Sequence, residues 1–307
     1  MKPIIYRFKN FLKEHFPWPI RKLPVHTNLG CPHRENRAGG CVYCYNPGFS
    51  SLSADLPDVS VQISEGIEKS RANGFAGKFI AYFQTDTNTY APISILEPWW
   101  REIQKYPGDI VGLAVGTRPD CLSKEALSLL SEIGERYMVW LELGLQSAHD
   151  KTLELINRGH DFACFADAVQ QVKRHPNILI CAHIILGLPG ESQNDMLTTI
   201  HEINGLKLDG VKIHHLQVIK HTILANWFSQ GKVKVFTESE YIDLLIKLIP
   251  HLSPRISVHR LVGDIRQDLL IAPLWKTPKT RIIQLIEQGL KAENEYQGIL
   301  ADSTLRK

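Results

Sequence analysis

Short apolar runs alternate with amphipathic stretches along most of the chain. The runs are apolar at consecutive positions and rich in branched and aromatic residues, which is typical of strands buried on both faces. They cover residues 24–28, 78–84, 110–116, 137–145, 178–186 and 210–218. Stretches with the period of an amphipathic helix lie between them, near residues 60–73, 94–105, 123–132, 162–174 and 193–206. This alternation predicts a parallel sheet with helices on its outer side.

Six such units predict an α/β fold, an open partial (β/α)6 barrel of the TIM-like type. In barrels of this kind the chemistry lies at the carboxyl ends of the strands, so unusual polar residues are expected directly after each apolar run. Cys31 follows the first run, Gln84 the second, Thr117 the third and Gln146 the fourth, and a Gly-Leu-Pro-Gly-Glu stretch that contains Leu188 follows the fifth. An active site is therefore expected at this edge of the sheet.

The pattern becomes less regular after the sixth run. A helix is expected over residues 239–252, a short strand over 256–262 and a final helix over 280–295. We read these elements as a small C-terminal α/β extension. The predicted organisation is an N-terminal extension in residues 1–22, the partial barrel in residues 23–220 and an extension that covers the open side of the barrel in residues 221–307.

The composition is that of an ordinary globular protein, with 44% hydrophobic and 22% charged residues among 307. No uninterrupted apolar stretch approaches the roughly 18 residues of a membrane-spanning helix, so no membrane partner is expected. The first residues lack the apolar core of a signal peptide, and a cytoplasmic location is therefore expected. A net charge of +3 permits nucleic-acid binding without requiring it.

Three of the six cysteines lie close together, with the spacing C-x9-C-x2-C. Thiolates ligate iron–sulfur clusters, and a [4Fe–4S] cluster held by Cys31, Cys41 and Cys44 alone would have one iron open to another ligand. The alternative is a non-enzymatic zinc-binding protein with a Cys3His site, in which His33 or His26 is the fourth ligand. The remaining cysteines are expected to be small buried side chains; they are Cys121, Cys164 and Cys181.

The triad ends in a cysteine–x–aromatic–cysteine motif, in the loop after the first strand of a β/α barrel. This arrangement resembles the radical S-adenosylmethionine (SAM) superfamily. The long first gap resembles the branch that includes the Elongator catalytic subunit. Motifs at residues 83–92, 116–122, 142–147, 157–161, 187–191, 260–264 and 272–275 are together similar to the YhcC/YtqA family, and the resemblance covers essentially the whole chain.

The resemblance implies a [4Fe–4S] cluster on the three cysteines and SAM on its open iron, with cleavage of SAM to a 5′-deoxyadenosyl radical. Tyr43 then lies beside the adenine, and Arg158 binds the SAM carboxylate. Gln84 stands where many relatives have a Gly-Gly-Glu motif that holds the SAM amino group. A buried carboxylate is costly unless it is paired, so Glu142 is expected to contact the ribose hydroxyls or an arginine. Further SAM contacts are expected from Thr117, Gln146 and Leu188.

The resemblance also implies a substrate, a wobble uridine of tRNA whose carboxymethylaminomethyl group becomes an aminomethyl group. The partners implied are tRNA, an electron donor such as flavodoxin or ferredoxin, and a methyltransferase that acts next. A small metabolite or a tetrapyrrole is the alternative substrate. The basic residues expected to contact RNA are Lys2, Arg7, Lys9, Lys13, Arg21, Lys22, Arg34 and Arg37, with Phe16 and Trp18 stacking on bases. No catalytic side chain is predicted.

Overall fold

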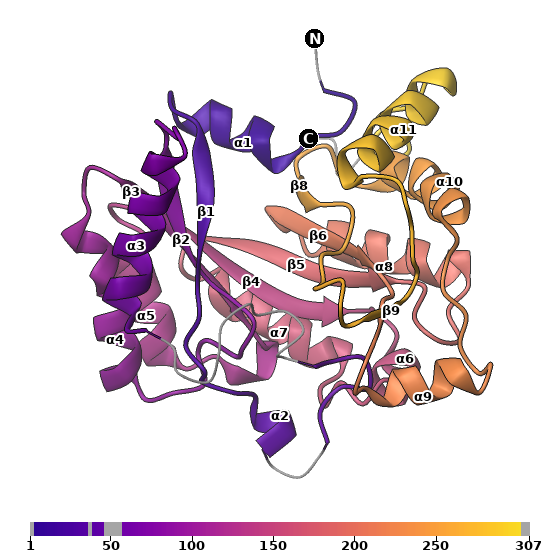
Figure 1. Ribbon diagram of the computed structural model, residues 1–307, viewed down its shortest axis with the longest axis horizontal. Helices are drawn as coiled ribbons and strands as arrows, with labels where there is room; N and C mark the ends of the chain where they lie inside the picture. The colour runs from indigo at the N-terminus through magenta and orange to yellow at the C-terminus, as the bar shows by residue number, and fades with distance from the viewer. Residues whose placement is uncertain (1–2, 36–38, 46–56, 302–307) are drawn as a thin grey trace.

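The computed structural model describes residues 3–35, 39–45 and 57–301 and contains one large curled parallel sheet (Figure 1). Its seven strands follow the order β1-β2-β3-β4-β5-β6-β8, and every neighbouring pair is parallel. The strands are β1 (Ile20–Val25), β2 (Lys78–Phe83), β3 (Ile110–Thr117), β4 (Met138–Gln146), β5 (Ile178–Leu186), β6 (Gly210–His215) and β8 (Ser257–Arg260). The predicted open barrel is confirmed.

Helices cover the outer face of the curled sheet (Figure 1). Those of the main α/β repeat are α3 (Val59–Ala72), α4 (Ile93–Arg101), α5 (Lys124–Ile133), α6 (Asp150–Leu155), α7 (Phe162–Val172) and α8 (Gln193–Gly205). The others are α1 (Phe8–His15), α2 (Pro32–Glu35), α9 (Ile223–Ser229), α10 (Glu238–Leu248) and α11 (Lys279–Ala292). No helix in the described ranges is both long and apolar enough to cross a membrane.

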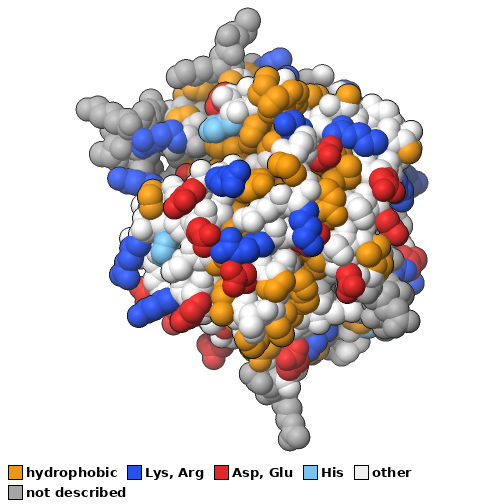
Figure 2. Space-filling model, turned by 90° about the vertical axis from the view of Figure 1, so that its left-hand side faces the viewer, with side chains coloured by type: hydrophobic (Ala, Val, Ile, Leu, Met, Phe, Trp, Pro, Cys, Tyr) orange, Lys and Arg blue, Asp and Glu red, His pale blue; other side chains and the backbone are white. Residues whose placement is uncertain are grey.

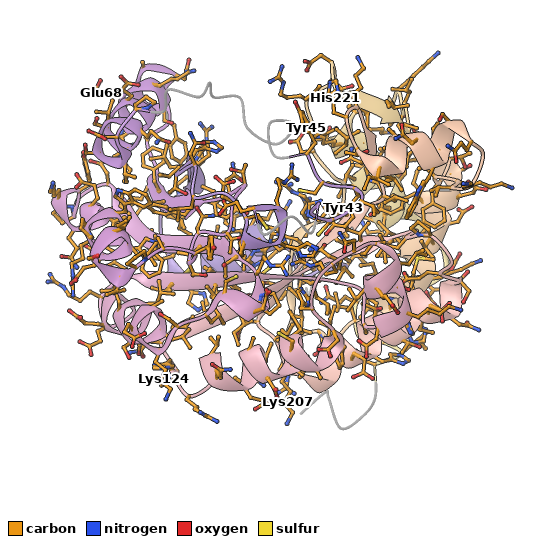
Figure 3. The ribbon with its side chains drawn as sticks, turned by 90° about the horizontal axis from the view of Figure 1, so that it is seen from below. Tyr43, Tyr45, Glu68, Lys124, Lys207 and His221 are labelled. Carbon is orange, nitrogen blue, oxygen red and sulfur yellow. The ribbon has the colours of Figure 1, made fainter. Side chains whose placement is uncertain are left out.

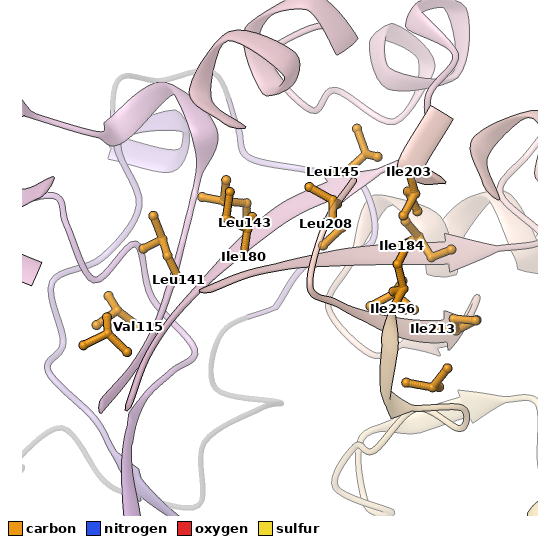
Figure 4. Packing of buried hydrophobic residues seen from close by; sticks show 14 of the residues in the cluster. Val115, Leu141, Leu143, Leu145, Ile180, Ile184, Ile203, Leu208, Ile213 and Ile256 are labelled. Atoms are coloured by element: carbon orange, nitrogen blue, oxygen red, sulfur yellow. The ribbon is translucent and has the colours of Figure 1, made fainter. Parts of the chain in front are cut away.

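The two faces of the sheet differ in chemistry because side chains alternate along each strand. Outward side chains such as Leu141, Leu143 and Ile184 are fully buried with the helices in one apolar cluster (Figure 4). Inward side chains include charged groups, and Glu142 and Lys212 both line cavities inside the curl. The outer face therefore contains the main hydrophobic core, and the inner face is left for chemistry.

Helix α1 lies at the amino ends of the strands, opposite the end that carries α2 (Figure 1). Phe8 and Phe11 meet the buried ring of Trp140 from β4 edge-on, with ring centroids 5.6 and 5.2 Å away. Phe8 also stacks on His259 of β8 at 3.9 Å. This aromatic group closes the inside of the half-barrel at one end, so the interior opens at the carboxyl ends of the strands.

The first strand differs from the prediction. It was expected over residues 24–28, but β1 runs over Ile20–Val25. The prediction missed the first part of the strand because the charge of Lys22 interrupts the apolar pattern. In the structure Lys22 points into the half-barrel and pairs with Glu142. The first of the boundaries expected at residues 22 and 220 thus falls within β1.

The expected strand over residues 256–262 is β8, the seventh strand of the main sheet rather than part of a separate extension. The run over 210–218 divides into β6 and β7 (Val218–Ile219), which pairs antiparallel with β9 (Leu270–Ala272).

Candidate active site at the carboxyl ends of the strands

A cavity of about 590 Å³ lies inside the curled sheet at the carboxyl ends of its strands. This is the size of a site for a small molecule or cofactor. The cavity is lined by every residue expected to hold the cluster or SAM except Leu188, namely Cys31, Cys41, Tyr43, Cys44, Gln84, Thr117, Glu142, Gln146 and Arg158. Leu188 is 2% exposed and belongs to an apolar cluster with Val42 and Ile156.

The loop that carries the cysteines is folded by its own backbone. The carbonyl of Cys31 accepts hydrogen bonds from the amides of Arg34 and Glu35 at 2.9 and 3.1 Å, and the amide of Cys44 donates to the Cys41 carbonyl at 3.0 Å. Gly40 precedes Cys41 with a φ of +73°, a conformation that glycine adopts without strain. These turns bring all three thiols to the wall of one cavity.

A second segment, Asn157 to Gly159, clamps this loop from the β4 side. The Asn157 side-chain amide donates to the Gly40 carbonyl at 2.8 Å, and the Asn157 carbonyl accepts from His33 Nε2 at 2.7 Å. Gly159 has a φ of +77°, and a Cβ at this position would come within 2.5 Å of the His33 ring. The sequence motif around Asn157 therefore positions the cysteine loop.

The geometry of these residues argues against the zinc alternative. The Nε2 atom of His33 is engaged with the Asn157 carbonyl, and His26 Nδ1 lies 3.3 Å from the hydroxyl of Thr85. A tetrahedral zinc site with bonds of 2.3 Å needs sulfur atoms about 3.8 Å apart. Within the described ranges, the one group of three or more metal-binding side chains with mutual distances under 4.8 Å is Glu142, Cys181 and His183, and it contains none of the clustered cysteines. The wider spread of three thiols suits a multi-iron cluster.

The environment of Cys44 also suits a metal centre. Burial, and after it the neighbouring Cys41, raises the pKa of its thiol to about 12. A thiolate at this position therefore needs a bound cation, because metal coordination removes the proton and balances the charge.

Arg158 was expected to bind the SAM carboxylate, and the structure places it at the cysteines. Its Nη2 donates to the Gly144 carbonyl at 2.7 Å, and its Nη1 lies 3.7 Å from the sulfur of Cys41. Among the residues that the structure describes, the buried Nε of Arg158 has no hydrogen-bond partner. Arg118 makes a bidentate ion pair with Asp120, at 2.9 Å on both oxygens, and donates to the Arg158 carbonyl at 3.0 Å. An unpaired donor beside the cysteines fits a site that takes a carboxylate-bearing ligand.

Thr117, Gln84 and Gln146, the other residues expected to contact SAM, lie at the carboxyl ends of β3, β2 and β4. The Thr117 hydroxyl lies 2.6 Å from that of Thr89. Gln84 follows β2, and its backbone N–H donates a hydrogen bond to the Val25 carbonyl at 3.2 Å. Gln146 ends β4 with a φ of +77°.

Two stretches that follow strands of the sheet, at Ser147 and at Gly187, contact other side chains of the protein. Ser147 is fully buried and donates to the carboxylate of Glu191. Gly187, at the start of the stretch that contains Leu188, lies against the ring of Phe236.

Glu142 is shielded from solvent, and its ion-pair partners in the described part of the chain do not include an arginine. It is paired with Lys22 from β1 and Lys212 from β6, and it accepts from His183 Nε2 of β5 at 2.8 Å. Lys212 also donates to the hydroxyl of Tyr82 at 2.7 Å. We call Lys22, Tyr82, Glu142, His183 and Lys212 the floor network.

Pairing with two lysines holds the pKa of Glu142 well below its ordinary value even though burial works against ionisation. Burial lowers the pKa of Lys212 to about 7 and that of His183 to about 4. Near pH 7 the network therefore contains an ionised Glu142, a Lys212 that is only partly protonated and a neutral His183.

Sequence reasoning did not find the cationic members of the floor network. Lys212 stands inside the apolar run over 210–218, and a charge inside such a run was the available signal, because it is tolerated only opposite a partner. Lys22 was expected on an RNA-binding surface and lies inside the half-barrel instead.

The other described basic residues of the N-terminal segment lie at α1 or at the start of β1, at the end of the sheet opposite the cysteine loop (Figure 1). Arg21 stacks over Phe75 at 4.0 Å near the start of this strand, while the cysteines follow its end (Figure 1). Trp18 is 45% exposed at the same far end, with the Lys78 ammonium 3.9 Å from its ring. Lys2 and Arg37 lie outside the described residues. The expected RNA-binding surface is therefore not beside the cavity, except at Arg34, which donates to the Cys44 carbonyl at 2.9 Å.

Aromatic side chains stand on the cysteine side of the cavity (Figure 3). Tyr43 lines the cavity, and Tyr45 reaches the His221 ring at a centroid distance of 5.2 Å. Seen from below the view of Figure 1, Tyr45 and His221 lie together, away from Lys124 of α5 and from Lys207, which follows α8 (Figure 3).

Comparisons with known proteins agree with this site. The model of the radical SAM superfamily matches residues 25–203, and that of the radical SAM C-terminal domain matches residues 208–292. Protein MJ0486 of Methanocaldococcus jannaschii is 38% identical over 94% of this chain and 89% of its own length. Protein YtqA of Bacillus subtilis is 34% identical with the same coverage. A tRNA uridine(34) acetyltransferase of M. jannaschii is 27% identical over 84% of this chain and 56% of that protein.

Solved structures share the fold. Elp3 of Methanocaldococcus infernus superposes with a TM-score of 0.72 at 19% identity, over 91% of this chain and 64% of that one. Methylornithine synthase superposes with a TM-score of 0.56 at 11% identity, over 93% of this chain and 86% of that one.

Proposed function

The chain belongs to the radical SAM superfamily, and from this premise we propose that it remodels the side chain of the wobble uridine of tRNA. As a member of this superfamily it is an enzyme that uses a [4Fe–4S] cluster and SAM. The proposed reaction converts a carboxymethylaminomethyl group on the base to an aminomethyl group. With SAM as the two-electron oxidant, the methylene carbon next to the carboxylate is oxidised, water adds to it, the C–N bond breaks and the two-carbon unit leaves as glyoxylate. A methyltransferase that acts next and an electron donor such as flavodoxin or ferredoxin are the proposed partners.

One observation carries the choice of substrate. Relatives that share the radical SAM part of this chain are named tRNA uridine(34) acetyltransferases, one of which aligns over 84% of the chain. A second relative of this name, from Dehalococcoides mccartyi, aligns over 58% of the chain at 26% identity. The simplest explanation of this similarity is that the related barrels modify the same nucleotide of tRNA, and this explanation argues by analogy between relatives.

The residues of the cavity have assigned roles in this proposal. When bound, the cluster and SAM supply a 5′-deoxyadenosyl radical that removes a hydrogen atom from the substrate. Cys31, Cys41 and Cys44 hold the cluster. The free Nε of Arg158 donates to a carboxylate oxygen beside them, and Tyr43 packs against the adenine. The half-barrel keeps water from the reacting atoms, because its far end is closed by α1.

Binding of tRNA is proposed at the mouth of the cavity. Figure 2 shows Lys and Arg side chains interspersed with Asp and Glu on the outer face over the N-terminal half of the sheet, without the one-sign field that attracts a polyanion. Tyr45 and His221 stand near the cavity instead and offer rings on which an extruded base stacks.

The test is mass spectrometry of tRNA nucleosides from a strain that lacks this gene. We expect loss of aminomethyl-type wobble uridines and accumulation of the carboxymethylaminomethyl form. A plasmid copy of the wild-type gene should restore the product, and a copy with Cys41→Ala should not. An unchanged set of wobble uridines in the deletion strain contradicts the proposed substrate while leaving the radical SAM chemistry in place.

A further inference from the structure

Arg260 ends strand β8 and lines the main cavity. It is the register partner of Lys212 on β6, and the two residues together line a smaller cavity of about 230 Å³ that shares Arg260 with the main one. The Arg260 side chain is half-buried and makes no hydrogen bond or ion pair within the described ranges. A guanidinium in such a place commonly serves a ligand, because an enclosed charge without a counter-ion is costly.

The acidic groups around Arg260 are already engaged. Glu142 is paired with Lys22 and Lys212, and Asp264 on the same cavity wall is paired with Lys279 of α11. Among the described residues, the inner walls of the two cavities therefore bring three basic side chains, Lys22, Lys212 and Arg260, to the one carboxylate of Glu142, although Lys212 is only partly protonated near pH 7. This excess of positive charge is what an anionic ligand group would balance.

The neighbouring histidines add neutral donors. His214 lies next to the floor network, with its ring 5.8 Å from that of His183. Burial, and after it the charge of Arg260, lowers the pKa of His214 well below its ordinary value. A neutral imidazole beside a guanidinium donates a hydrogen bond to an anion without adding charge.

We propose that Arg260, with Lys212 and His214 beside it, binds a carboxylate of the substrate. This inference rests on the proposed function for the identity of the substrate, whose carboxymethylaminomethyl side chain ends in a carboxylate. A guanidinium fork matches a carboxylate with two parallel hydrogen bonds. The phosphates of an RNA lie on its backbone, at the mouth, whereas the tip of a base side chain reaches the inner end where Arg260 stands. The contact also sets the selectivity for a carboxylated base over the aminomethyl product.

The carboxylate of SAM is the other possible source of this anion, so the test separates the two. Two nucleosides differ only in the carboxylate, 5-carboxymethylaminomethyluridine and 5-methylaminomethyluridine. Their affinities are measured by equilibrium binding to the anaerobically reconstituted protein in the presence of SAM. The wild type should prefer the carboxylated nucleoside by about tenfold to a hundredfold, the range for a hydrogen-bonded charge. Arg260→Gln should bind both nucleosides equally and keep the wild-type affinity for SAM.

The control is Arg266→Gln, because Arg266 lines the same cavity but is paired with Asp268 at 2.7 Å. This variant should keep the preference for the carboxylated nucleoside, and Arg260→Lys should keep part of it. Preference retained in Arg260→Gln, or loss of SAM affinity in that variant, overturns the proposal.

A second ligand pair separates this proposal from the choice of wobble uridine. N-benzylglycine and N-methylbenzylamine carry the same difference without a nucleoside. If only this pair shows a preference that depends on Arg260, the carboxylate site stands and the uridine proposal fails. If tRNA is modified as proposed but neither pair shows the preference, the carboxylate site is wrong and the function stands.

Discussion

At the scale of single residues, Glu142 shows how a costly group is kept inside the half-barrel. Its side chain is fully shielded from solvent and meets Lys22, Lys212 and His183 from three other strands. A buried carboxylate is tolerated when its charge and its lone pairs are both satisfied, as they are at this position. The floor network is thus a set of mutually dependent charges, and changing one member leaves the others unbalanced.

Glu142→Gln should therefore destabilise the protein strongly. The variant leaves the buried Lys212 and the half-buried Lys22 without their carboxylate, and loss of one partner of a buried ion pair typically costs about 3–5 kcal/mol in free energy of unfolding. Glu132→Gln is the control, because Glu132 pairs with Arg101 on the surface, where loss of an ion pair has little effect. Chemical denaturation of both variants checks this. Equal stability of Glu142→Gln and the wild type would contradict the role given to the network.

Lys212 should make stability depend on pH in the alkaline range. Its pKa is about 7 in the folded protein, mainly because of burial, and about 10.4 in an unfolded chain. Between these values the unfolded lysine holds a proton that the folded one does not, so the free energy of unfolding rises with pH from about 7 to 10. Above this window the lysine is neutral in both states, and below it charged in both.

The check is denaturation at pH 7 and pH 9 in the wild type and in Lys212→Met. The variant should lack the part of the rise that Lys212 contributes, while Lys124→Met, on the outer helix α5, should keep the full rise. An identical pH dependence in all three proteins would show that Lys212 is not shifted.

At the scale of elements, the cysteine loop depends on the segment that follows β4. Gly159 and Gly190 have similar φ values of +77° and +84°, but only Gly159 faces another side chain, the ring of His33. Gly159→Ala should displace His33 and lower the iron content of the reconstituted protein. Gly190→Ala adds the same backbone strain in open space and should leave iron content unchanged. Equal iron contents in the two variants would contradict the clamp.

The repeating elements were predictable from sequence because apolar runs and amphipathic helices carry strong local patterns. The strand β1 was displaced in the prediction because Lys22 interrupts such a pattern, and only its distant partner Glu142 explains the burial of this charge. The cysteine triad was predictable from spacing. The contacts between the cysteine loop and the segment after β4 were not predictable, since Asn157 and Gly40 are 117 positions apart in sequence. Pairings of this range depend on how the sheet curls.

At the scale of the whole molecule, the half-barrel works because its two ends differ. Aromatic side chains of α1 fill the amino end, and polar groups and cysteines line the carboxyl end. The strand β8 joins the same sheet from the C-terminal part of the chain and adds Arg260 to the cavity. The segments on both sides of the main repeat thus complete the site rather than lie beside it.

Phe11→Ala tests the closed end. Phe11 is 9% exposed and meets Trp140 edge-on, so the variant leaves a cavity and should lower the free energy of unfolding by about 3 kcal/mol. Trp18→Ala is the control, since Trp18 is 45% exposed at the same end of the molecule and should matter little. Urea denaturation followed by fluorescence checks both. Similar stabilities of the two variants would show that α1 does not close the barrel.

The binding of one cluster by Cys31, Cys41 and Cys44 is tested most directly by iron content and 5′-deoxyadenosine formation. Anaerobically reconstituted wild-type protein should hold about four irons per chain and form 5′-deoxyadenosine from SAM when reduced. The triple alanine variant should do neither. A wild-type protein that binds one zinc and no iron, or a triple variant that forms 5′-deoxyadenosine at the wild-type rate, would contradict the assignment of this site.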